Sequence, residues 1–180
     1  MKKKNLLLAL SSLTMLVGCG NISFDAAKEF AKTNYSQDAA SAKYASGSVK
    51  TVTEYTKAEG IFQNVKLGKT ENTGDASILV LTEAGVAVYG DKATYSTSGK
   101  SLKITYNMDA ADFIKNYLGL TVDAKSMKGT AKVVYSYNSD GLIASSSSKF
   151  DFSLNSSTAG ISITGALKGS SSAKYTYTKK

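Results

Sequence analysis

The sequence contains no histidine, proline or tryptophan, and all 22 of its basic residues are lysines. Without histidine, neither a Ser-His-Asp nor a Cys-His catalytic site can form, and the usual zinc sites lose their nitrogen ligand. Without arginine, planar bidentate recognition of phosphate or carboxylate is excluded as well. These absences remove most hydrolytic, zinc-dependent and arginine-based functions.

Cys19 is the only cysteine, so no internal disulfide can form. It follows three lysines at residues 2–4 and an apolar run of 12 residues at 6–17, broken only by two serines and a threonine. That run is well short of the ~20 residues that a permanent transmembrane helix needs. A positive start, a short apolar core and small residues before the cut are typical of a secretory signal peptide. A buried cysteine behind an ordinary leader is the alternative interpretation.

The segment Leu16, Val17, Gly18, Cys19 resembles the lipobox of bacterial lipoproteins. In that family the cysteine receives a diacylglyceryl group, the leader is cut before it, and the acylated cysteine becomes the N-terminus. The resemblance implies a removed signal peptide at 1–18, a lipidated N-terminus with a short tether at 19–22, and one domain at 23–180. Because two or more acyl chains hold a protein stably on a bilayer, we expect a membrane-anchored protein of the cell envelope. It would face outward from the cytoplasmic membrane, or lie on the outer membrane if the host has one.

Loss of the leader would leave 162 residues and lower the formal net charge from +8 to +5. A basic surface close to a membrane attracts anionic lipid or cell-wall polymer. The lysines are scattered, however, and a solvated sheet face accounts for most of them. No basic cluster is interleaved with stacking aromatic residues, which argues against nucleic acid as a partner.

The first part of the domain shows helical periodicity. Ser23 can cap a helix whose apolar stripe contains Phe24, Ala27, Ala31 and Tyr35. The alanine-rich residues 37–45 either extend this helix or form a second one after Ser36. From residue 48 the period changes to two, which predicts roughly nine antiparallel strands.

Several segments of this meander carry specific expectations. Residues 69–75 are polar and predict a loop, whereas 77–82 and 86–89 predict strands. Residues 161–167 and 173–177 predict two separate strands, and Asp140 with Gly141 predicts a hairpin turn. Residues 109–118 predict a helix inserted into the meander, with acidic residues in its first turn.

The expected fold is α+β: a strongly curved antiparallel sheet, forming an open half-barrel, with a leading helix and one inserted helix over its concave face. This order of elements resembles the LolA/LppX-like lipoprotein and lipid carriers over nearly the whole mature chain. Some members of that family hold their closed state with an arginine, which is absent here, so the lid mechanism is not carried over. A closed lipocalin-like barrel and a sheet used only as an interaction surface are the alternative folds.

A half-barrel of this kind would bind a hydrophobic ligand, such as a lipid, in its concave face. The alternative for each candidate residue is ordinary packing against the helices. The candidates on the strands alternate with polar residues, and two more come from the inserted helix. They are Ile61, Val65, Leu102, Ile104, Val133, Tyr135, Phe150, Phe152, Phe113 and Tyr117.

The competing interpretation is a non-catalytic surface module that binds cell-wall glycan or a protein partner. It would use surface tyrosines of the outer face, namely Tyr55, Tyr95, Tyr175 and Tyr177. We expect no enzymatic activity, because the carboxylate pairs are explained by helix dipoles and turns and no phosphate loop or nucleophile motif is present. No cofactor, metal or nucleic acid is expected, and the chain should be a monomer.

Overall fold

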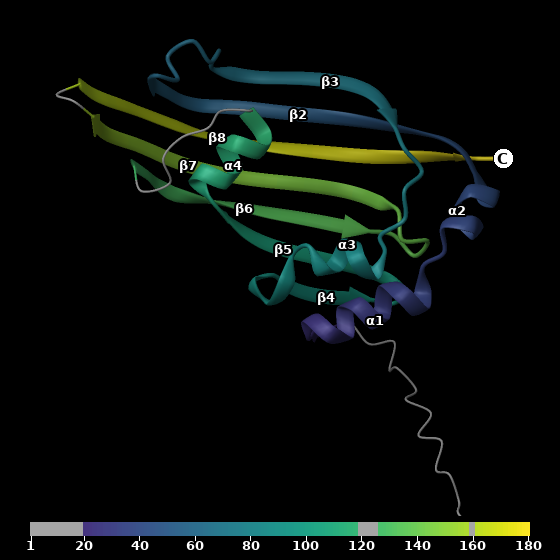
Figure 1. The fold of residues 1–180 in the computed structure, drawn as a ribbon. Coiled ribbons are helices and arrows are strands. Elements are labelled where there is room, and N and C mark those ends of the chain that lie inside the picture. Colours follow the sequence, from purple (N-terminus) through teal and green to yellow (C-terminus); the bar gives the residue numbers. More distant parts are fainter. Residues whose placement is uncertain (1–19, 119–125, 159–160) are drawn as a thin grey trace, which may run out of the picture.

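A single antiparallel sheet organises the computed structural model, which describes residues 20–118, 126–158 and 161–180. The sheet has eight strands in the order β1-β4-β5-β6-β7-β8-β2-β3, and it does not close into a barrel. The expected curved α+β half-barrel is therefore confirmed, with eight strands rather than nine (Figure 1). The strands are β1 Gly20–Ile22, β2 Tyr44–Gly60, β3 Gly68–Ala76, β4 Thr94–Ser98, β5 Ser101–Asp109, β6 Met127–Tyr137, β7 Ile143–Thr158 and β8 Ile161–Lys179.

The leading helical region is two helices, α1 Phe24–Asn34 and α2 Gln37–Lys43. The hydroxyl of Ser23 accepts a hydrogen bond from Ala26 N at 3.2 Å, and the hydroxyl of Ser36 accepts one from Ala39 N at 3.3 Å. Each serine satisfies a backbone donor that the first helical turn leaves free. The second cap explains why the alanine-rich segment begins a new helix.

The prediction for residues 69–75 was wrong, because they belong to β3, which pairs with β2 along its whole length. This strand is an edge strand and is exposed at every residue except Ala76. With no core to face on either side, it carries Lys, Thr and Glu instead of alternating apolar residues. Charged edge strands of this kind resist pairing with other chains.

The predictions for residues 77–82 and 86–89 were also wrong. The first segment makes only one isolated bridge, between Val80 and Leu142, and the second overlaps helix α3 Glu83–Ala87, which is capped by Thr82. A short apolar run has the same composition in a buried strand and in a crossing segment. Here the run crosses the end of the sheet and packs against α1 and α2, where Leu81 is 7% exposed.

Three further segments differ from expectation. Residues 61–64 form a turn, although the candidate Ile61 was expected on a strand, and β8 is one strand of 19 residues instead of two. Gly20–Ile22, expected to be a tether, forms β1 and pairs with β4. The inserted helix is confirmed as α4 Ala110–Leu118, as is the turn at Asp140 and Gly141, and a short 3-10 helix, η1, lies at Gly90–Lys92.

The sheet has two chemically distinct faces. The inner face carries the side chains of Leu102, Val133 and Phe150, over which the helices pack, and the outer face carries the alternate residues, including Lys132 and Lys149. Figure 1 shows α4 in front of the central strands, α1 and α3 along the β4 edge, and α2 at one end. Between these helices, a part of the inner face formed by β7, β8, β2 and β3 has no helix of the described residues over it.

Candidate functional site

Helix α4 covers one end of the inner face through an aromatic cluster. The ring centroid of Phe113 lies 5.0 Å from that of Phe150 and 5.2 Å from that of Phe152. Phe113, Phe150 and Phe152 are 3%, 5% and 1% exposed, and Val133 packs in the same cluster at 1%. Four of the predicted ligand-binding residues therefore come together, and they form a filled core beneath the helix.

Two glycines on β8 make room for this cluster. A side chain added at Gly169 would place its Cβ 2.9 Å from the ring of Phe150, and one added at Gly165 would reach within 3.0 Å of Phe62. The contact at Gly169 is shorter than real Cβ atoms show, and that at Gly165 is tighter than most, so glycine at these positions lets the rings lie against the strand. The sheet is shaped here for aromatic packing.

Helices α1 and α3 cover the opposite region of the inner face. Leu102 and Ile104 are 1% and 0% exposed and pack with Ala27, Phe30 and Tyr95. These two predicted ligand-binding residues thus lie in a second core, separate from the one under α4. Tyr135 is the exception among the candidates, because it is only half-buried and packs against both clusters.

The other candidates lie apart from this arrangement. Ile61 is 46% exposed in a turn, and Val65 packs partly buried at the margin of the α4 cluster. Tyr117 belongs to α4, but its side chain lies outside the described part of the structure, as does the whole of Cys19. Lipidation of Cys19 therefore stays a prediction.

The uncovered part of the inner face has a floor of small side chains, which we call the hydroxyl floor: Thr53, Ser146, Ser148 and Ser171. The strand registers place Ser148 opposite both Val133 and Ser171, and Thr53 opposite Ser171. The hydroxyl oxygens of Thr53 and Ser171 lie 3.2 Å apart in a hydrogen bond. Ser148 is 6% exposed and lies between Val133 and Ser171 on the neighbouring strands.

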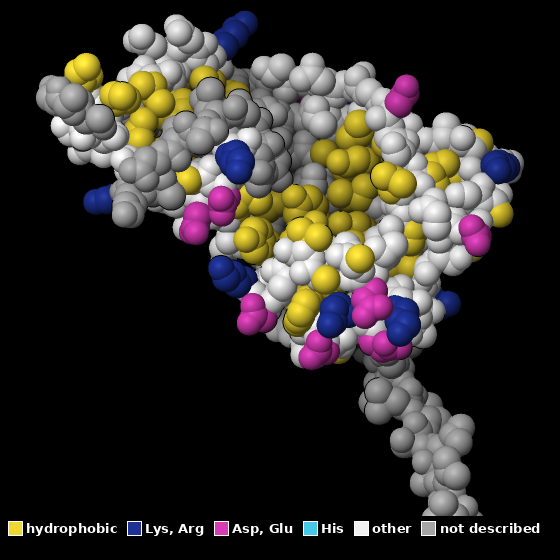
Figure 2. All heavy atoms as spheres, in the orientation of Figure 1, with side chains coloured by type: hydrophobic (Ala, Val, Ile, Leu, Met, Phe, Trp, Pro, Cys, Tyr) yellow, Lys and Arg dark blue, Asp and Glu magenta, His cyan; other side chains and the backbone are white. Residues whose placement is uncertain are grey.

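Half-buried aromatic side chains surround the hydroxyl floor. Tyr135 lies opposite Ser146 on β6, Tyr55 lies on β2 beside Phe150, and Tyr175 follows Ala173 along the inner face of β8. Figure 2, seen from the side that α4 covers, shows hydrophobic side chains gathered in a hollow beside that helix. A low floor of hydroxyls between aromatic walls is thus the open feature of this face.

One end of this face carries an apolar pocket of about 250 Å³. It lies between the crossing segment, which contributes Leu79, Val80 and Leu81, and the strand residues Tyr137 and Ile143. Leu79 is 69% exposed. Burial raises the pKa of Tyr137, and a hydrogen bond joins that residue to Tyr89. The pocket offers apolar surface that the protein itself leaves uncovered.

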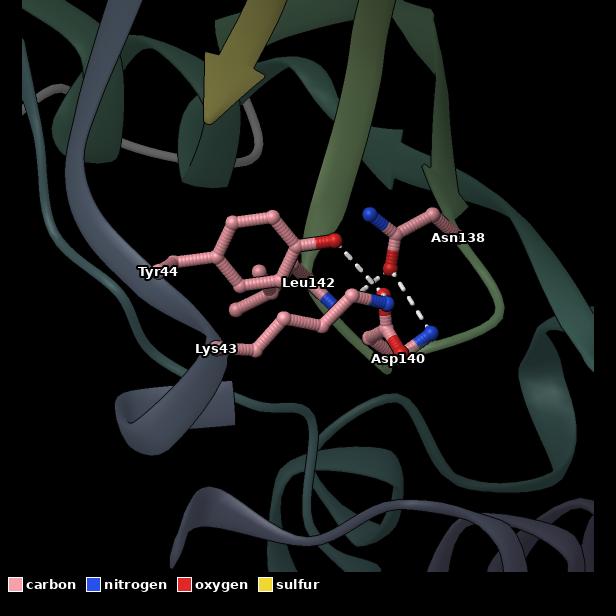
Figure 3. Close-up of polar contacts among 5 residues, drawn as sticks. All are labelled: Lys43, Tyr44, Asn138, Asp140 and Leu142. Atoms are coloured by element: carbon pink, nitrogen blue, oxygen red, sulfur yellow. Dashed lines mark hydrogen bonds and ion pairs between the residues drawn. The ribbon is translucent and has the colours of Figure 1, made fainter. Parts of the chain in front are cut away.

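The turn between β6 and β7 closes this end of the molecule (Figure 3). Asp140 accepts a hydrogen bond at Oδ2 from the hydroxyl of Tyr44 at 2.6 Å and an ion pair from Lys43 Nζ at 2.7 Å. Both interactions stabilise the charged carboxylate, so they hold the pKa of Asp140 below its usual value. The side chain of Asn138 accepts hydrogen bonds from the backbone N–H of Asp140 and of Leu142, each at 3.0 Å. This network fixes α2 to the turn and has the character of a structural clamp.

The four tyrosines assigned to the outer face lie on the inner face instead. Tyr95 is 2% exposed within the α1 core, Tyr55 packs against the α4 cluster, and Tyr177 packs near Tyr44 with burial raising its pKa to about 12. Tyr175 is two residues before Tyr177 on β8, so its side chain lies on the same inner face. The assignment failed because Tyr alternates with Thr and Lys in these strands, and either set could face solvent.

Within the described ranges, no helix is both long and apolar enough to cross a bilayer. The same residues contain no group of three or more acidic or cysteine side chains placed to hold a metal ion. No family model matches the chain, and neither a curated protein nor a solved structure matches it. The candidate site is therefore defined by its own geometry: a hydroxyl floor between aromatic walls, with a separate apolar pocket nearer the end of the strands.

Proposed function

We propose that this chain is a lipid-anchored protein of the bacterial cell envelope that binds an amphiphilic ligand, a lipid or lipid-like molecule, on the uncovered part of its inner face. The observation that carries the proposal concerns the described residues: helices cover one end of the central strands, the β4 edge and the other end of the sheet, but not the part between them. The part between them combines the hydroxyl floor with half-buried Tyr135 and Tyr175.

The two kinds of surface suit the two ends of an amphiphile. The hydroxyls of Thr53 and Ser171 can donate to or accept from a polar headgroup, whereas the pocket beside Leu79 and Ile143 offers apolar surface to a tail. The buried aromatic residues Phe113, Phe150 and Phe152 support this surface from below α4 instead of contacting ligand directly. The ligand site thus lies beside most of the residues predicted from the sequence.

The anchor would orient the sheet on the membrane. Cys19 directly precedes Gly20, the first residue of the edge strand β1. Acylation at Cys19 would hold the β1 edge near the bilayer. The β3 edge lies seven strand spacings away in the sheet order, about 34 Å measured along the curved sheet at about 4.8 Å per strand, so it would stand further from the membrane than the β1 edge. The inner face would open sideways, above the membrane surface. The resemblance to the LolA/LppX-like carriers is part of this proposal.

The test uses adjacent residues of β7 that point to opposite faces. Ser146→Phe would place a ring on the hydroxyl floor, and Ser147→Phe would place the same ring on the outer face. Binding of a fluorescent long-chain fatty-acid analogue to residues 20–180 is measured for both variants. We expect the first to lose binding by tenfold or more, since it fills the site, and the second to bind as the parent does. Equal binding by both variants, or none by the parent, would rule the site out.

The second candidate function is a non-catalytic module for a cell-wall component or protein partner. One observation favours it: the outer face carries hydroxyl and lysine side chains and has shallow hollows of its own.

A further inference from the structure

The outer face of the central strands is hollowed. A cavity of about 380 Å³, which we call the outer hollow, lies over β6, β7 and β8. Two further hollows continue it, one toward Lys168 on β8 and one toward Lys50 on β2. The side chains that reach the outer hollow from this face are Lys132, Val134, Ser147, Lys149, Ser170 and Ser172.

The charges in the outer hollow are of one sign. Lys132 and Lys149 lie directly opposite each other in the β6–β7 register, and neither makes an ion pair within the described residues. Like charges placed directly opposite on neighbouring strands destabilise a sheet. This pair therefore costs the folded protein stability that a Lys–Glu or Lys–Thr pair would not.

A second pair of lysines repeats this arrangement. Lys50 and Lys174 face each other across β2 and β8, and both line the continuation of the outer hollow. Lys50 is paired with Glu71 at 2.7 Å, whereas Lys174 makes no ion pair in the described part of the chain. The two pairs are separated by two strands and four residues, roughly 17 Å by standard sheet spacings. Ser147 and Ser172 lie between them.

Few acidic side chains lie near the two lysine pairs, and those that do lie close to other lysines. Asp151, which lines the hollow toward Lys168, is paired with that lysine at 2.7 Å. Glu54 lies opposite Ser170, but on its other side it faces Lys69 of the edge strand, whose pKa is raised mainly by its hydrogen bond to Glu71 and less by Glu54. No carboxylate lines the outer hollow itself. The unpaired positive charge there, surrounded by serine hydroxyls, is complementary to an anion.

We propose that the outer hollow binds phosphate groups of an extended anionic polymer, lying diagonally from Lys132 and Lys149 toward Lys174 and Lys50. Lysine ammonium groups act as point charges on phosphate oxygens, and serine hydroxyls add hydrogen bonds. A flexible polymer can follow these hollows across the strands and reach both lysine pairs. This site is on the opposite face from the amphiphile site and does not depend on it.

The test measures binding of fluorescently labelled short-chain polyphosphate to the full chain in non-ionic detergent. The variant is the double substitution Lys132→Gln with Lys149→Gln. Its matched control is Lys103→Gln with Lys128→Gln, which removes the same charge from the outer face outside the hollows. Each lysine near an anionic surface strengthens binding by about tenfold or less. We therefore expect the affinity of the first variant for polyphosphate to fall by about tenfold or more, and that of the control by about twofold. Raising the salt should weaken binding by the parent, because exposed charges are screened.

Three results would overturn the proposal: no binding of polyphosphate by the parent, equal losses in the two double variants, or displacement of polyphosphate by phosphatidylglycerol micelles at a lower phosphate concentration. The last result would assign the surface to membrane headgroups. Ser146→Phe separates this proposal from the amphiphile site, since it should leave polyphosphate binding unchanged. Both double variants should remain folded, because removing either pair of lysines deletes no contact of the core.

Discussion

The inner and outer faces of β7 differ most clearly at residues 149–152. Phe150 and Phe152 are 5% and 1% exposed on the inner face, whereas Lys149 and Asp151 between them are exposed on the outer face. The inner residues hold the helices, and the outer residues contact no helix of the described structure. Packing that stabilises the fold is thus concentrated on the inner face, so the outer face can carry unpaired charge without loss of core contacts.

The largest expected effect comes from the aromatic cluster. Phe152→Ala should lower the free energy of unfolding by about 3–5 kcal/mol, because it deletes a ring packed against Phe113 and Phe150 and leaves a cavity. Ser153→Ala, one residue further on the outer face, should change it by less than about 0.5 kcal/mol. Urea unfolding followed by circular dichroism measures both. Similar losses in the two variants would contradict the division between faces.

Two turn glycines extend the comparison to the ends of the strands. Gly141 has φ +78°, and a Cβ there would lie 2.5 Å from the ring of Tyr35. The Tyr35 hydroxyl donates a hydrogen bond to the carbonyl of Lys100, which holds the ring in place. Gly99 has φ +56° and open space around it. Gly99→Ala should therefore cost about 1 kcal/mol from backbone strain alone. Gly141→Ala should cost about 2–4 kcal/mol, since overpacking adds to that strain. Thermal unfolding of the two variants distinguishes them, and equal shifts would show that α1 yields at this contact.

The ion pair at the β6–β7 turn should contribute more to the free energy of unfolding than an exposed ion pair on the outer face. Asp140→Asn should cost about 1–2 kcal/mol, because it weakens the bond from Tyr44 as well as the ion pair with Lys43. Asp151→Asn, which removes an exposed pair with Lys168, should cost less than about 0.5 kcal/mol.

The pH dependence of stability provides a second readout of Asp140. Its pKa is lowered in the folded protein. The stability that it contributes is therefore fully present above the ordinary aspartate pKa and is lost as the pH falls through the lowered value. Asp140→Asn should flatten the acid side of the stability profile, measured by urea unfolding at several pH values. An unchanged profile would mean that the network in Figure 3 does not stabilise the carboxylate.

The smallest expected effect has the opposite sign. Lys149→Glu would replace a like-charge pair with an ion pair to Lys132, so it should raise the unfolding free energy by about 0.2–1 kcal/mol. The same change should abolish polyphosphate binding. A variant that is more stable and loses its ligand would show that Lys149 is retained for binding. A loss of stability would instead give Lys149 a structural role.

The sequence predicts most of this sheet because period-two alternation marks strands that have one buried face. Val133 and Phe152 follow that rule, and the caps at Ser23 and Ser36 follow from hydroxyl chemistry. The rule fails where a strand has no buried face, as in β3, and where an apolar run crosses the end of the sheet, as around Leu81. In both places tertiary contacts decide the structure.

The candidate site was only partly predictable for the same reason. Periodicity identifies Leu102, Ile104 and Phe150 as inner-face residues, but it does not show which of them the helices cover. The uncovered surface consists of serine and threonine, whose small side chains give no hydrophobic signal. Their parity with Phe150 was a usable indication, since Ser146 and Ser148 must share its face. On the outer face, Lys132 and Val134 are two residues apart on β6, so the sequence also indicates that their side chains share one face.

The measurement that tests the central claim most directly is native mass spectrometry of residues 20–180 after incubation with a lipid extract of host membranes. The account predicts added mass that dissociates as an amphiphile, is absent from Ser146→Phe, and is retained by Ser147→Phe. A parent protein that shows only the mass of the polypeptide would contradict it, as would equal retention of the amphiphile by both variants.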